Sequence, residues 1–133
     1  MNITWLTRFM SDRAIWEGRY ADLWSIPHVI SGMLVAFALL GLEIDFWQGL
    51  GVSVLVAIAW ELFERFTGLS STEFLTNSIA DLLFAQIGFI TGYALLRGLR
   101  HERAMNVAWA LLIVFIACVI LGWISYTYYR RMP

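Results

Sequence analysis

The chain has 133 residues, of which 60% are hydrophobic and 14% charged, with a formal net charge of −1. This composition excludes an ordinary soluble domain, and scattered arginines without any lysine exclude a nucleic-acid-binding face. The single cysteine, Cys118, has no second cysteine in the sequence with which to form a disulfide. We therefore expect one all-α, polytopic membrane domain.

The first segment, residues 3–23, predicts an amphipathic helix in the membrane interface. Trp5, Phe9, Trp16 and Tyr20 recur at helical intervals, with charged residues between them. The alternative is a short soluble helix packed on the bundle. We recognise no cleavable signal peptide in this segment, so we expect it to remain on the mature protein.

Four apolar blocks follow, each close to the roughly 20 residues that cross a bilayer as a helix. Pro27 is tolerated in the first turn of a helix and fixes the start of the first block. Glu43 and Asp45 mark the loop after it, and a polar run after Gly68 closes the second block. A basic loop, residues 97–103, follows the third block. The four predicted transmembrane helices cover about residues 24–42, 46–66, 77–96 and 107–126.

Three ionisable residues lie at the same depth in these helices. Short loops force the helices to alternate in direction, so the starts of the first and third and the ends of the second and fourth share one membrane face, called side X. At 1.5 Å per residue, His28, Glu61 and Asp81 each lie roughly 6–8 Å inside side X. Ionisable groups in hydrocarbon are costly and mark functional sites by default. These three are therefore the candidate catalytic residues.

Small residues predict which helix faces meet. Each of the three ionisable residues ends a stripe of small residues spaced three or four apart, which places each stripe on one helix face. Facing stripes would bring the ionisable residues into one pocket that opens toward side X. The pair Gly88 and Gly92 is a G-x-x-x-G motif, which we assign to packing within the chain. The packing residues are Gly32, Ala57, Gly88 and Gly92.

Further polar and aromatic residues are assigned to the pocket rim. They are Trp60, Glu64, Arg65, Asn77 and Gln86. Purely structural roles are the alternatives: Ser78 and Asp81 as a capping box, Glu64 as a partner of Arg65, and His28 as an interfacial hydrogen-bonding residue.

Three kinds of chemistry suit the predicted pocket. One is binding of a divalent cation such as zinc, manganese or iron by Glu61, Asp81 and His28. The second is acid and base catalysis by neighbouring carboxyl groups. The third is recognition of an amine or a polyhydroxylated headgroup. No established metal motif such as H-E-x-x-H is present, and the residues do not select among the three.

The motif W-E-x-x-E at residues 60–64 is followed by Asn77, Asp81, Gly88 and Gly92. This pattern resembles the VanZ-like family of small bacterial multi-helix membrane proteins. The resemblance extends over residues 28–92, with Ala85 where the family has an asparagine. It implies a protein of the bacterial cytoplasmic membrane, from a family linked in some members to low-level resistance against lipophilic glycopeptide antibiotics and without a settled biochemical activity.

The distribution of arginines predicts cytoplasmic termini, because side X carries more of them than the opposite face. Arg8, Arg13, Arg19, Arg65, Arg130 and Arg131 lie on side X, against Arg97, Arg100 and Arg103. The predicted function is a VanZ-like envelope protein that binds or modifies a lipid-linked or amphipathic molecule, with membrane lipids as partners. The alternative is a non-enzymatic accessory or structural subunit of a larger membrane complex. Further expected partners are a lipid-linked ligand, a second copy of the chain or other subunits of a membrane complex.

Overall fold

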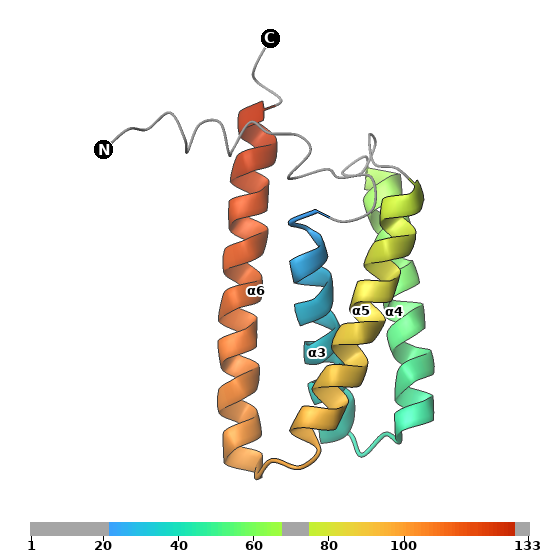
Figure 1. Cartoon of the computed structure of the whole chain (residues 1–133), viewed down its shortest axis with the longest axis vertical. Helices are drawn as coiled ribbons and strands as arrows, with labels where there is room; N and C mark the ends of the chain where they lie inside the picture. Colours follow the sequence, from blue (N-terminus) through green and yellow to red (C-terminus); the bar gives the residue numbers. More distant parts are fainter. Residues whose placement is uncertain (1–21, 68–74, 130–133) are drawn as a thin grey trace, which may run out of the picture.

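The computed structural model describes residues 22–67 and 75–129 of the chain (Figure 1). These residues form four α-helices joined by short connections, which confirms the predicted all-α class. The helices are α3 (Ser25–Gly41), α4 (Phe46–Thr67), α5 (Leu75–Leu96) and α6 (His101–Tyr129). The predicted interfacial helix covers residues 3–23, and residues 3–21 of it lie outside the part of the chain that the structure describes.

The helices have the lengths and surfaces of a membrane protein. Helices α4, α5 and α6 are long and apolar enough to cross a membrane, whereas α3 is apolar but has only 17 residues. Large apolar side chains face outward: Leu55 on α4, Leu83 on α5 and Ile113 on α6 expose 68%, 61% and 66% of their surface. In a bilayer these side chains would contact lipid instead of water.

One predicted boundary is wrong. The basic loop was expected to extend to Arg103, but α6 already begins at His101. Glu102 lies in the first turn of α6, where a negative charge is favourable because the helix dipole is positive at that end. Charged residues can therefore extend this helix beyond its apolar part.

Successive helices run in alternate directions (Figure 1). The starts of α3 and α5 and the ends of α4 and α6 therefore lie together at the upper end of Figure 1, which is side X as defined from the sequence. Helix α3 packs most extensively against α5 and also contacts α6, while α4 packs mainly against α5. Helix α3 is thus the central helix of the bundle.

Glycines allow the backbones of α3 and α5 to come into direct contact. A β-carbon at Gly32 would collide with the backbone carbonyl of Ala85, and one at Gly88 would collide with the carbonyl of Val29. A β-carbon at Gly92 would lie 2.8 Å from the α-carbon of Met33 on α3, which is also too close. The predicted use of Gly32, Gly88 and Gly92 in packing within the chain is confirmed.

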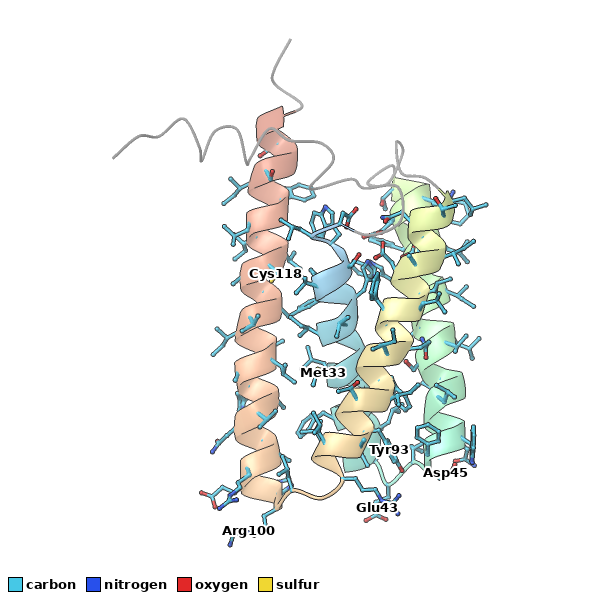
Figure 2. The ribbon with its side chains drawn as sticks, in the orientation of Figure 1. Met33, Glu43, Asp45, Tyr93, Arg100 and Cys118 are labelled. Atoms are coloured by element: carbon cyan, nitrogen blue, oxygen red, sulfur yellow. The ribbon has the colours of Figure 1, made fainter. Side chains whose placement is uncertain are left out.

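An aromatic core fills the bundle away from side X. Phe89 is completely buried and lies beside Tyr93 and Phe46, with ring centroids 5.9 Å and 6.0 Å away. Gly49 on α4 makes room for the Phe89 ring. Figure 2 shows Tyr93 toward the end of the bundle where Glu43, Asp45 and Arg100 lie. The polar site described next is at the other end.

Candidate functional site at side X

The three ionisable side chains that were predicted to converge do so near side X. His28 lies in the first turn of α3, Glu61 in the last part of α4 and Asp81 in the second turn of α5. The Nε2 atom of His28 is 4.0 Å from Oε1 of Glu61 and 3.8 Å from Oδ2 of Asp81. Glu61 and Asp81 expose only 6% and 2% of their surface, so this cluster is internal.

Asp81 is held by hydrogen bonds from two helices. Ser25 donates from Oγ to Oδ1 of Asp81 over 3.1 Å, and Asn77 donates from Nδ2 to Oδ2 over 3.1 Å. The same Asn77 amide also donates to Oδ2 of Asp22 over 3.2 Å. Asn77 therefore joins two carboxylates, and the orientation of Asp81 is fixed by α3 and by the preceding turn of α5.

The capping-box alternative for Ser78 and Asp81 is wrong. Helix α5 is already helical at Leu75, so Asp81 lies beyond its first turn, which contains no acidic residue. The hydroxyl of Ser78 instead accepts a 2.9 Å hydrogen bond from Nη2 of Arg65, which ties the end of α4 to α5.

Glu64 lies deeper than its assignment to the rim suggested. It is partly buried, and one carboxylate oxygen lies within 4.8 Å of ligand atoms of both His28 and Glu61. Residues three apart share one helix face, so Glu64 accompanies Glu61 toward α3. The compact set of candidate metal ligands is therefore His28, Glu61 and Glu64, whereas the sequence suggested Asp81 as the third member.

A cavity of about 120 Å³ lies between α3, α4 and α6, next to this cluster. His28 and Glu64 form its polar end, and Ser31 and Ser53 add two hydroxyl groups. The remaining lining is largely apolar and includes Val35, Val56, Ala57, Trp60, Phe115 and Val119. The cavity thus combines an acidic end with an apolar body.

Two predicted rim residues have different surroundings. Trp60 lines the cavity, is 47% exposed and lies beside Phe63 with ring centroids 5.7 Å apart. Gln86 on α5 does not line the cavity. Its amide nitrogen and oxygen are both buried and make no hydrogen bond within the part of the chain that the structure describes.

Sequence reasoning missed Ser25 and Asp22, although a signal was present. Asp22 accepts a 2.8 Å hydrogen bond from the backbone N–H of Trp24, the local turn that aspartate commonly makes before a helix. The α6 residues Phe115 and Val119 were also missed. A helix that is apolar on all sides gives no indication of the face that lines a cavity.

The geometry is compatible with cation binding, with proton transfer between His28 and a carboxylate, and with recognition of a positively charged group. No model of a known protein family matches the chain, and neither curated proteins nor solved structures give a significant match. The functional argument therefore depends on the site itself.

Proposed function

We propose that this protein is a multi-pass, VanZ-like protein of the bacterial cytoplasmic membrane that binds an amphipathic lipid whose polar end carries an amine. The observation that carries this proposal is the cavity between α3, α4 and α6. His28 and Glu64 lie at its polar end, and valine, alanine and aromatic side chains line most of its length.

The chemistry of the polar end favours an amine. Glu61 and Glu64 are two carboxylates within reach of one group, and a carboxylate binds an ammonium through charge-assisted hydrogen bonds. Asp81, 3.8 Å from His28, adds a third negative charge nearby. An anionic headgroup would be repelled by this arrangement.

The apolar part suits a segment of a hydrocarbon chain. A water molecule needs roughly 10–15 Å³ of accessible volume, and the cavity has about 120 Å³. The ionisable groups of the lining, His28 and Glu64, lie near side X, so a linear molecule would enter with its headgroup near side X and its chain toward the middle of the bundle.

The bacterial membrane, the number of passes and the cytoplasmic termini are part of this proposal. They rest on the W-E-x-x-E pattern at residues 60–64 and on the arginine distribution. A contribution to resistance against lipophilic glycopeptides would follow if the bound molecule is lipid-linked. A purely structural subunit is less well supported, because Asp81 is not a helix cap and the glycine stripes are already used inside the chain.

Photolabelling tests the proposal. The protein, reconstituted in vesicles, is exposed to a phosphatidylethanolamine carrying a photoreactive acyl chain, and labelled peptides are identified by mass spectrometry. We expect labelling of the α3, α4 and α6 segments that line the cavity. Ala57→Phe fills the cavity and should reduce this labelling several-fold, whereas Ala59→Phe, at an exposed position of the same helix, should not.

A second comparison tests the acidic end. A matched phosphatidylglycerol probe should label the wild-type cavity more weakly than the phosphatidylethanolamine probe, and the double variant Glu61→Gln, Glu64→Gln should remove this preference. Equal labelling of Ala57→Phe and wild type would rule out the cavity as the binding site. Equal labelling by the two lipids would rule out amine recognition.

A further inference from the structure

We infer that His28, Glu61 and Glu64 form a binding site for a divalent first-row transition-metal ion between α3 and α4. Each side chain offers one ligand atom, and these three atoms all lie within 4.8 Å of one another. This inference does not depend on the proposed lipid binding, and a bound ion would compete with a lipid amine for Glu61 and Glu64.

The spacing of the atoms suits an ion between them. The 4.0 Å between Nε2 of His28 and Oε1 of Glu61 is too long for a hydrogen bond, which needs roughly 2.7–3.2 Å. Two ligand atoms about 2.0–2.2 Å from a tetrahedral ion lie roughly 3.3–3.6 Å apart. The observed 4.0 Å is slightly longer, so binding of an ion requires the two side chains to approach each other by about 0.4–0.7 Å. The whole set, whose atoms lie within 4.8 Å of one another, must close around the ion in the same way.

Rigid elements carry all three ligands. Glu61 and Glu64 are three residues apart on α4 and so share one face, which is turned toward His28 in the first turn of α3. The side chains of His28 and Glu61 are only 12% and 8% exposed, which limits their freedom to move. A site built on packed helices keeps its ligand geometry better than one on loops.

The donor set selects the class of ion. An imidazole and two carboxylates are ligand types that divalent transition-metal ions accept. Imidazole suits zinc, iron, copper and nickel ions, whereas magnesium and calcium prefer oxygen ligands alone. Three protein ligands also leave a position open for water or another ligand, and the cavity beside His28 and Glu64 has room for it.

Asp81 supports the site without belonging to the ligand set. Its Oδ2 atom is 3.8 Å from Nε2 of His28, and its two oxygens accept hydrogen bonds from Ser25 and Asn77. These bonds hold the carboxylate in place, so that its negative charge lies close to the ion. A fixed negative charge at this distance favours a bound cation.

Zinc binding to the full-length protein tests the inference. The protein is purified in mild detergent, treated with a chelator, passed through a desalting column and titrated with Zn²⁺ in competition with a chromophoric chelator. We expect one high-affinity Zn²⁺ per chain. His28→Gln and Glu64→Gln should each weaken Zn²⁺ binding by at least about tenfold. Loss of a residue that only supports a ligand already costs about 10–100-fold in metal affinity, and loss of a ligand should cost no less.

Matched controls lie at the opposite end of the bundle. His101 and Glu102 are exposed residues at the start of α6, so His101→Gln and Glu102→Gln should leave Zn²⁺ affinity unchanged. Circular dichroism and gel filtration verify that each variant retains its helices and its monodisperse state. Co²⁺ provides a second readout, because its visible absorption should show nitrogen and oxygen ligands in the wild type and change in His28→Gln.

The inference is overturned if the wild-type protein binds less than one Zn²⁺ per chain, or if the well-folded His28→Gln and Glu64→Gln variants bind as tightly as the controls. Displacement of bound Zn²⁺ by a tenfold excess of Mg²⁺ or Ca²⁺ would overturn the assignment to a transition metal. Ala57→Phe separates the two proposals, since it should block lipid labelling and leave Zn²⁺ binding intact.

Discussion

Gly32 of α3 lies against the backbone carbonyl of Ala85 on α5, so closely that a β-carbon at position 32 would overlap the carbonyl oxygen. Gly32→Ala must therefore push the two central helices apart. We expect a loss of about 1–3 kcal/mol in the free energy of unfolding, as is typical of overpacking. Unfolding of the purified protein in mixed micelles of mild detergent and SDS measures this loss.

Gly51 on α4 provides the control for this prediction. A β-carbon there would meet nothing within 4 Å, so Gly51→Ala should be neutral or slightly stabilising, since alanine favours the helix over glycine by up to about 1 kcal/mol. Equal effects of the two substitutions would show that α3 and α5 are not in close contact.

Asn77 connects Asp22, before α3, to Asp81 on α5 through a single side-chain amide. Asn77→Ala removes both hydrogen bonds and places two carboxylates near each other without this bridge. We expect destabilisation by about 1–3 kcal/mol, measured by the same unfolding assay. Asn106→Ala on the exposed surface of α6 should change stability by less than about 0.5 kcal/mol. A neutral Asn77→Ala variant would contradict the described network.

The sequence was sufficient to predict the helices and the depth of the site. Apolar length identifies α4, α5 and α6, and alternating direction places His28, Glu61 and Asp81 near one face. Small-residue spacing then identifies the packed faces of α3 and α5. These features depend on local periodicity and short loops, which can be read without a structure.

Other features of the site depend on contacts between helices and could not be predicted. The partner of Arg65 is Ser78, and this choice is set by how α4 leans on α5. Whether Glu64 or Asp81 joins His28 and Glu61 depends on small rotations of the helices. Helix α6 is apolar on all sides where it lines the cavity, so its cavity-lining face has no periodic signal.

Glu43, in the loop between α3 and α4, has a positive φ of 58°. This left-handed conformation is unfavourable for most residues with a side chain and free of steric cost for glycine. Glu43→Gly should therefore stabilise the protein by up to about 1 kcal/mol. Glu43→Val should destabilise it, because a branched β-carbon tolerates this conformation poorly. A stability ranking of valine above glycine at position 43 would contradict the loop conformation.

Gln86 has its amide nitrogen and oxygen buried, with no hydrogen bond to either within the described residues. Replacing a buried, unsatisfied polar group by an apolar group of similar shape removes a desolvation penalty of about 1–3 kcal/mol. Gln86→Met conserves the length of the side chain and should raise the free energy of unfolding by an amount up to that range. Gln48→Met, at an exposed position in the first turn of α4, is the matched control and should have little effect. A loss of stability in Gln86→Met but not in Gln48→Met would contradict the prediction and show that the buried Gln86 amide makes favourable polar interactions in the folded protein.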